Sequence, residues 1–198
     1  VEFINQKPIG RSSRSNPVTY TKVYDDIRKL FAQSTLAKKR NYKPGFFSFN
    51  IDGGRCPNCK GDGEIKIEMQ FMADVYIKCE DCNGKKFKDE VLDIKCFDKN
   101  IYEILNLSIE EAIILFKKNK ENKIANKLQP LVDVGLNYLT LGQSSNTLSG
   151  GEAQRIKLAS FLTKSLNNKN SLFIFDEPTT GLHFHDISKL LKSFNHFV

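Results

Sequence analysis

The sequence lacks several features that would each define a class of protein. No run of 18 apolar residues occurs, so we expect no transmembrane helix. The first ten residues do not have the layout of a signal peptide, which favours a cytoplasmic location without membrane contact. No G-x4-G-K-[ST] pattern occurs either, so the sequence contains no phosphate-binding loop of that type.

The composition that is present suits a folded protein with a basic surface. The 198 residues are enough for one large or two small domains, and an apolar content of 40% can supply a core. The formal net charge is +7, and the lysines and arginines are spread widely. This charge fits a polyanionic partner such as DNA and fits an ordinary lysine-rich surface equally well.

Four of the five cysteines form two C-x2-C pairs, Cys56 with Cys59 and Cys79 with Cys82, separated by nineteen residues. In a cytoplasmic protein this spacing favours one tetrahedral zinc ion over disulfides. Four thiolates leave no open coordination position, so the zinc is expected to be structural rather than catalytic.

The residues between and after these pairs predict how the metal is held. Alternating residues at 64–69 and 75–77 predict a β-hairpin whose base brings both pairs to one ion. The fifth cysteine, Cys96, is expected in the core on a strand over 91–97. Phe46, Phe47 and Phe49 lie near the basic run 38–40; such a mixture suits nucleic acid, although their density favours a core role.

The stretch LSGGE predicts a helix start built to face an anion. Ser149 is in the N-cap position, and Glu152, three residues later, completes a capping box. Gly150 and Gly151 allow a partner to approach the backbone closely. The first-turn N–H groups and the positive end of the helix dipole form a phosphate site. An apolar stripe continues the helix: Ile156, Leu158, Ala159 and Leu162.

A short apolar run, 172–175, ends in two acids and Pro178, and is typical of a buried parallel strand. Acids at such a strand end lie where open α/β sheets bind their ligands. Asp176 is expected to hold Mg²⁺, and Glu177 to orient or deprotonate an attacking water. Residues 179–181 are expected to form a turn.

Other helix signals are spread along the chain. Residues 1–4 suggest a strand. The polar residues that follow suggest a loop, until a helix begins near Thr19. Ser108 with Glu111 forms a second capping box, and Gly135 is expected to end a further helix.

The run LSGGEAQRIKLA followed by LFIFDEPTTGLH resembles the signature motif, Walker B motif and D-loop of ABC ATPases. A C-x2-C module before this signature is typical of the UvrA family, a component of the bacterial excinuclease. The chain is similar to that family over nearly its whole length, including QKPIGRSSRSNPVTYT, FSFNIDGGRCPNCKGDGEIKIEM, DVYIKCEDCNGKKF and KLQPLVDVGLNYLTLGQSSNTLSGGEAQRIKLA.

The resemblance implies an α/β fold: part of an ABC ATPase domain, with an inserted, mostly helical signature domain that bears a zinc-bound β-hairpin. Residues 1–20 would be the Q-loop segment of the second ABC domain. Residues 21–146 would be the insertion, with the zinc module at about 54–90. Residues 147–198 would carry the signature helix, Walker B and D-loop.

The resemblance also implies roles for individual residues. Gln6 would contact Mg²⁺ and the attacking water. Ser149, Gly150 and Gly151 would touch the γ-phosphate of ATP held by another ABC module, whereas Asp176 and Glu177 would serve the nucleotide of their own module. Five basic residues are candidates for DNA contacts: Arg11, Arg14, Lys38, Lys39 and Arg40.

The implied function is that of a dimeric, ATP-driven sensor of damaged double-stranded DNA that loads UvrB at lesions in nucleotide excision repair. The phosphate-binding loop and the switch histidine of an ABC domain are missing, so the chain is expected to be a fragment with negligible ATPase activity alone.

Two alternatives remain open. Transporter and chromosome-organising ABC ATPases share LSGGE and DEP but lack cysteine pairs at this point. A zinc-dependent peptide-binding module of the J-domain co-chaperones has the repeat C-x-x-C-x-G-x-G, which CPNCKGDG fits and CEDCNGKK loses at its last glycine.

Overall fold

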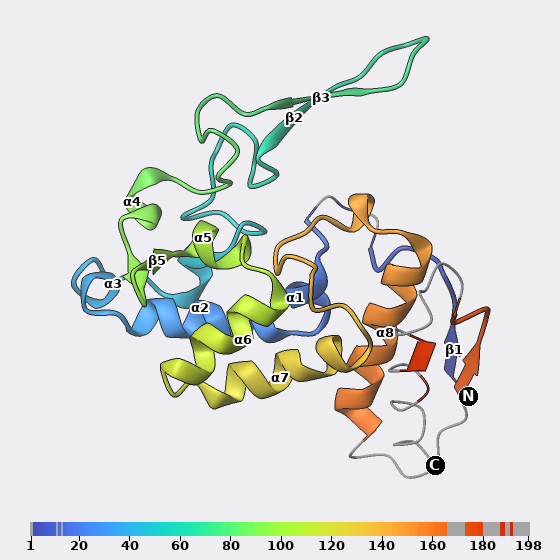
Figure 1. Cartoon of the computed structure of the whole chain (residues 1–198). Helices are drawn as coiled ribbons and strands as arrows, with labels where there is room; N and C mark the ends of the chain where they lie inside the picture. Colours follow the sequence, from blue (N-terminus) through green and yellow to red (C-terminus); the bar gives the residue numbers. More distant parts are fainter. Residues whose placement is uncertain are drawn as a thin grey trace. The chain divides into compact units, whose positions relative to one another are not determined.

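The computed structural model describes residues 2–10, 12, 14–165, 173–179, 187–188 and 191 (Figure 1). The chain divides into two compact units, which are described separately. The first comprises residues 1–24 and 105–198, and the second comprises residues 25–104. No helix among the described residues is both long and apolar enough to cross a membrane.

The first unit contains a parallel pair of strands, β1 (Glu2–Ile4) and β6 (Phe173–Phe175), with Ile4 opposite Phe175. The predicted parallel strand is therefore confirmed. Its predicted burial is wrong for Ile174, which is 43% exposed. In the described part of the chain β1 is the one strand paired with β6, so β6 is an edge strand there, and an edge strand is more exposed than the interior strands of an α/β sheet.

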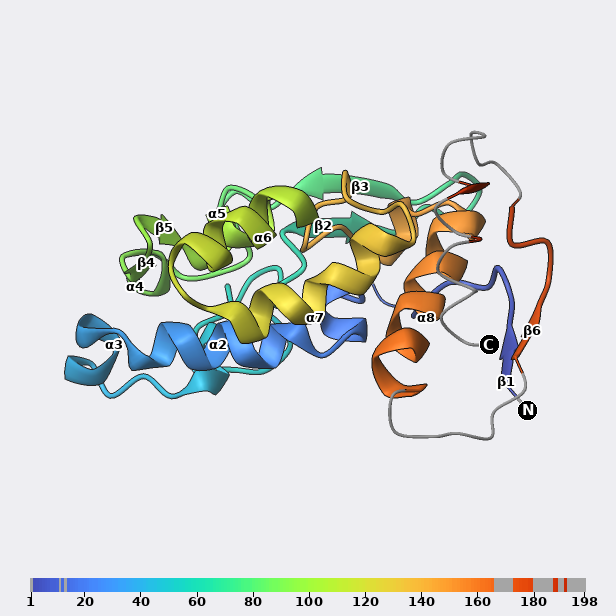
Figure 2. The ribbon, with the colours of Figure 1, turned by 60° about the horizontal axis from the view of Figure 1, so that its bottom comes forward.

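Helix α8 (Gly150–Ser165) contacts β1, and Figure 2 shows it alongside the two-stranded sheet. The apolar stripe predicted for this helix is buried at Ile156, Leu158 and Ala159. The side chain of Leu162 is outside the described residues. The turn predicted at 179–181 is likewise described only as far as Thr179.

The first unit also contains a pair of helices that precede α8 in the chain. Helices α6 (Ile109–Lys118) and α7 (Asn122–Asp133) pack against each other, and α7 also packs against α8. The capping box at Ser108 is confirmed, because Ser108 and Glu111 exchange hydrogen bonds. Gly135, with φ of +77°, follows the end of α7 as predicted.

Helix α1 (Pro17–Tyr20) corrects the expectation of a loop up to residue 18. Asn16 caps it by accepting a hydrogen bond from Thr19 N at 2.9 Å, and Thr19 Oγ1 accepts one from Asn16 N. Proline is well suited to the first helical position because its missing N–H would have no partner there. A short 3₁₀ turn, η2 (Ser145–Thr147), precedes α8.

The second unit contains α3 (Thr35–Lys39), η1 (Pro44–Phe47) and α4 (Asp89–Leu92), together with most of α2 (Val23–Gln33) and of α5 (Ile101–Leu105). Phe47 and Phe49 are fully buried, so the core role favoured for them is confirmed. Phe46 is half-buried and stacks on Tyr42, with ring centroids 4.0 Å apart.

The strand predicted over 91–97 is wrong. Its beginning lies in helix α4, whose first turn contains Asp89 and Glu90, acids that stabilise a helix N-terminus. Only Lys95–Cys96 forms a strand, β4, which pairs with β5 (Lys99–Asn100). Phe97 and Asp98 between them have φ of +56° and +61°, as a tight hairpin requires.

The predicted hairpin is confirmed. Strands β2 (Glu64–Ile67) and β3 (Val75–Lys78) are antiparallel, with Glu64 opposite Lys78. In Figure 1 the hairpin extends as a narrow arm from the loops that carry the cysteine pairs. Most of its side chains are exposed, including Phe71 at 95%.

Candidate metal centre and nucleotide-facing edge

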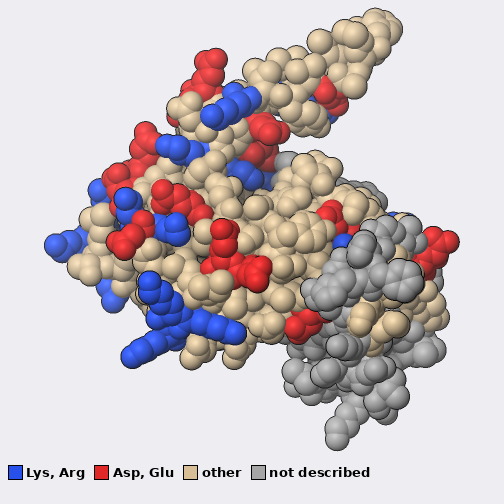
Figure 3. All heavy atoms as spheres, in the orientation of Figure 1, with Lys and Arg blue, Asp and Glu red and all other residues tan. Residues whose placement is uncertain are grey.

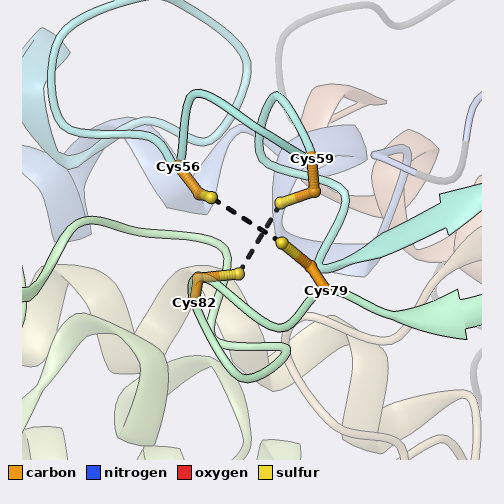
Figure 4. Close-up of side chains that lie close together, drawn as sticks. All are labelled: Cys56, Cys59, Cys79 and Cys82. Atoms are coloured by element: carbon orange, nitrogen blue, oxygen red, sulfur yellow. Dashed lines mark hydrogen bonds between the residues drawn. The ribbon is translucent and has the colours of Figure 1, made fainter.

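The four paired cysteines form one buried cluster (Figure 4). Their sulfur atoms all lie within 4.8 Å of one another. The Sγ atoms of Cys56 and Cys79 are 3.9 Å apart, and those of Cys59 and Cys82 are 3.7 Å apart. A tetrahedral zinc–thiolate site with bonds of about 2.3 Å has sulfur–sulfur edges of about 3.8 Å. The cluster therefore fits one tetrahedral metal ion and is too open for disulfides.

The two cysteine loops are built alike. Cys56 N donates to Lys86 O at 2.9 Å, and Cys79 N donates to Gly63 O at the same distance. Gly63 N also donates to Cys59 Sγ at 3.2 Å. Gly63 and Lys86 are equivalent, four residues after the last cysteine of their pair, and both are left-handed, with φ of +80° and +72°. Lys86 of the second repeat thus stands where the first repeat has Gly63, and it has the same left-handed backbone conformation.

Burial and hydrogen bonds act in opposite directions on the pKa values of the clustered cysteines. Burial raises the pKa of the Cys82 thiol to about 12 and also raises the pKa of Cys59. Burial acts in the same direction on Cys79, but hydrogen bonds from Cys82, Cys56 and Cys59 outweigh it, and the pKa of Cys79 is lowered. A bound cation would supply the charge that stabilises all four thiolates, so metal binding would release protons.

The start of α8 confirms the capping box predicted at Ser149. Ser149 N donates to Glu152 Oε2 at 2.8 Å, and Glu152 N donates back to Ser149 Oγ at 3.2 Å. Tyr138 Oη donates to the other carboxylate oxygen at 2.6 Å, a contact that the sequence did not predict. Burial, followed by the hydrogen bond to Glu152, raises the pKa of Tyr138 to about 12. The Glu152 carboxylate therefore accepts hydrogen bonds on both oxygens, from Tyr138 on one and from Ser149 on the other.

The carboxyl ends of the two strands are tied to α8. Gln154 Nε2 donates to Ile4 O at 3.1 Å and to Asp176 O at 2.7 Å. Asp176 and Glu177 follow β6 directly and are exposed, and Glu177 has φ of +46°. Gln154 was not predicted from the sequence.

The predicted glutamine lies at the same edge. A Cβ added to Gly150 would be 3.1 Å from Gln6 Oε1 and 3.2 Å from Gln6 Cβ, so the signature glycine packs directly against Gln6. Lys157, another unpredicted residue, donates to the residues on both sides of Gln6. The structure thus brings together three separate predictions: Gln6, the LSGGE turn and the strand-end acid Asp176.

The predicted DNA-contacting residues differ in their environments. Lys38 and Lys39 are exposed in the last turn of α3. Arg40 donates to Glu90 O at 2.7 Å and forms an ion pair with Asp93 at 3.1 Å, so part of its bonding capacity is used within its own unit. Arg14 is half-buried, and Arg11 is outside the described residues. On the face in Figure 3, basic and acidic side chains are intermingled.

The comparisons with known proteins agree with this geometry. A family model described as ABC transporter matches residues 60–180. Proteins named UvrABC system protein A from Clostridium tetani (strain Massachusetts / E88) and Staphylococcus aureus (strain COL) are each 58% identical to the chain and cover 96% and 98% of it. A crystal structure of UvrA2 from Deinococcus radiodurans has a TM-score of 0.92 and 46% identity, over 98% of this chain and 24% of that one.

The chain spans about a fifth of the length of the curated relatives, 20% in each case. The match nevertheless extends through both cysteine pairs, the LSGGE turn and the strand-end acids. The chain therefore belongs to the ABC transporter family, and within it resembles UvrABC system protein A over nearly its whole length.

Proposed function

We propose that this chain is part of the ATP-dependent damage-recognition subunit of bacterial nucleotide excision repair, which binds damaged double-stranded DNA as a homodimer and loads UvrB at lesions. The observation that carries the proposal is the gathering of Gln6, the capped LSGGE turn and Asp176 at one edge of the first unit. An α/β domain binds its ligand at such an edge, outside the carboxyl ends of its strands.

The residues at this edge have distinct roles in the proposed reaction. Ser149 precedes α8 as its cap, and Gly150 and Gly151 begin the helix, whose N-terminal dipole favours an anion, so the three residues would bind the γ-phosphate of ATP held by a different ABC module. Glu152 would fix the turn by its bonds to Ser149. Asp176 would hold Mg²⁺, which offsets phosphate charge in the full-length protein.

Glu177 is proposed as the general base and Gln6 as the residue that orients the attacking water and contacts Mg²⁺. Glu177 is exposed at the end of β6, as a carboxylate that must reach a water requires. The water attacks the γ-phosphorus, its proton passes to the Glu177 carboxylate, and the bond to the leaving ADP oxygen breaks.

The proposed organisation keeps three segments. Residues 1–20 form the Q-loop segment and 147–198 the signature helix, Walker B and D-loop, with 21–146 as an inserted signature domain. One structural Zn²⁺ is proposed at Cys56, Cys59, Cys79 and Cys82, whose spacing fits zinc. The ion would fix the base of the β2–β3 hairpin and leave no open position for catalysis.

The ATPase proposal is tested in the complete protein with Glu177→Gln. Loss of a general base is expected to lower kcat by about 100-fold or more, with normal nucleotide binding. Glu110→Gln, an exposed acid on α6, is the matched control and should retain activity. The isolated chain should hydrolyse ATP negligibly. Robust turnover by the isolated chain that Glu177→Gln abolishes would overturn the assignment of a fragment.

DNA binding is tested through its salt dependence in the complete protein. Each phosphate contact contributes roughly one unit to the slope of log affinity against log salt, so Lys38→Met and Lys39→Met should each reduce the slope by about one. Arg40→Met should act less on the slope, because Arg40 is paired with Asp93. A salt-independent affinity for unfolded peptide instead would favour the chaperone-type zinc module.

A further inference from the structure

Lys157 makes an unusual set of contacts in the third turn of α8. Its ammonium donates to Asn5 O at 3.1 Å, to Asn5 Oδ1 at 2.9 Å and to Lys7 O at 2.7 Å. An ammonium has three protons, so these bonds use its full donor capacity. All three acceptors are uncharged, and they belong to the two residues on either side of Gln6.

This arrangement is costly for a lysine that serves only as a surface charge. Partial burial, together with the nearby charge of Lys7, lowers the pKa of Lys157. A solvated lysine would avoid this desolvation, so the ammonium is held by the bonds that it makes. Two of its acceptors are backbone carbonyls two residues apart, and they converge on one ammonium only when the chain curls at Gln6.

Gln6 is confined from a second direction by the same helix. Gly150, in the first turn of α8, leaves room for the Gln6 side chain, since a Cβ there would come within 3.1 Å of Gln6 Oε1. Gln154, which lies between Gly150 and Lys157 in α8, donates from Nε2 to Ile4 O at the end of β1. Helix α8 therefore contacts the chain before, at and after Gln6.

We propose that Lys157 is a positioning residue that fixes the backbone around Gln6 and thereby aims the Gln6 amide at the Mg²⁺ and water of the ATPase site. The inference rests on the proposed function, because it assigns Lys157 an effect only through the role of Gln6. Helix α8, which begins with the signature turn, would then also support the Q-loop of the same module.

The test measures steady-state ATP hydrolysis by the complete protein with Lys157→Met, Gln6→Ala and the double variant. Misplacement of a catalytic group by about 1 Å can cost on the order of 100-fold in rate, so Lys157→Met should lower kcat by about 10- to 100-fold. The KM for ATP should change by less than about twofold, because Lys157 does not contact nucleotide in this arrangement. Lys118→Met, an exposed lysine at the end of α6, is the matched control.

The double variant separates positioning from general stabilisation. Adding Lys157→Met to Gln6→Ala should lower kcat no further, since effects that act through one residue are not additive. A further loss equal to that of Lys157→Met alone, or parallel changes of kcat, KM and melting temperature, would overturn the inference. If Gln6→Ala lowers kcat and Lys157→Met does not, the inference fails while the proposed function stands. If Gln6→Ala has no effect, both fail.

Asn5→Ala provides a second test that keeps both backbone acceptors. It removes one of the three acceptors of Lys157, so it should lower kcat in the same direction by a smaller factor, about two- to fivefold. Where Lys157→Met does not fold, Asn5→Ala decides the question, and an unchanged kcat in that variant overturns the inference.

Discussion

Replacing Gly61 by alanine tests how the cysteine loops are built, and Gly84→Ala is its matched control. Both glycines lie two residues after the second cysteine of a pair, with φ of +88° and +75°. An alanine in this left-handed region costs about 1–2 kcal/mol at either position. The surroundings differ: a Cβ on Gly61 would be 2.1 Å from Phe49 O, whereas one on Gly84 would be 3.1 Å from Lys78 Cε.

The difference in surroundings sets the expected magnitude. A carbonyl oxygen belongs to the backbone and cannot turn away, whereas the end of a lysine side chain can. Overpacking of this kind costs about 1–3 kcal/mol, so Gly61→Ala should lose about 2–5 kcal/mol in total against about 1–2 kcal/mol for Gly84→Ala. Because 1.4 kcal/mol is a factor of ten, the difference of about 1–3 kcal/mol means that zinc affinity should fall about 5- to 140-fold more in Gly61→Ala.

The assay is competition for Zn²⁺ against a chromophoric chelator, with the absorption spectrum of bound Co²⁺ reporting tetrahedral thiolate coordination. Gly61→Ala should lose affinity and alter the spectrum, while Gly84→Ala should keep the spectrum and lose little affinity. An equal loss of zinc affinity in the two variants, or a greater loss in Gly84→Ala, would show that the lack of room beside Phe49 O does not matter.

Two further predictions concern stability. Chelation of the proposed metal is expected to raise amide exchange in residues 54–90 while α6 and α7 keep their protection, because an ion held by the four cysteines would close the base of the hairpin; unchanged hairpin protection in hydrogen-exchange mass spectrometry would contradict this. Acid is expected to weaken the start of α8. Burial raises the pKa of Glu152, but bonds from Tyr138 and Ser149 outweigh it and lower the pKa below its ordinary value of 4.5. The carboxylate therefore stabilises the fold above that value and loses this contribution as the pH falls through the lower folded pKa. Urea unfolding between about pH 3 and 7 should show a flatter pH dependence for Glu152→Gln, and an identical profile would argue against the effect.

Much of the candidate site was predictable because its signals are local. Both capping boxes join residues three positions apart, so the pattern Ser-x-x-Glu contains the whole interaction. The cysteine loops are similarly local, and the spacing of the pairs is set by the hairpin between them. The parallel pairing of β6 was also predicted, since a short apolar run before acids is typical of an α/β sheet.

The failures occur where a local sequence pattern fits more than one structure. The apolar residues of 91–97 suggested a strand, but the acids at Asp89 and Glu90 favour a helix, and Phe97 and Asp98 turn the chain. Asn16 and Pro17 suggested a loop, although the same two residues are a good cap and first position of a helix. In each case one sequence pattern has two physical meanings, and packing selects one.

The sequence by itself determined the grouping of the four cysteines, the capped glycine turn and the strand-end acids, because each is specified by residues close together in the chain. Tertiary structure alone decided which side chains connect them. Lys157 meets Asn5 across 152 positions, Gln154 meets Ile4 across 150, and Arg40 meets Asp93 across 53. Such contacts leave no periodic or spaced pattern, because they depend on the path of the whole intervening chain, and so only the folded structure could identify the residues that support Gln6.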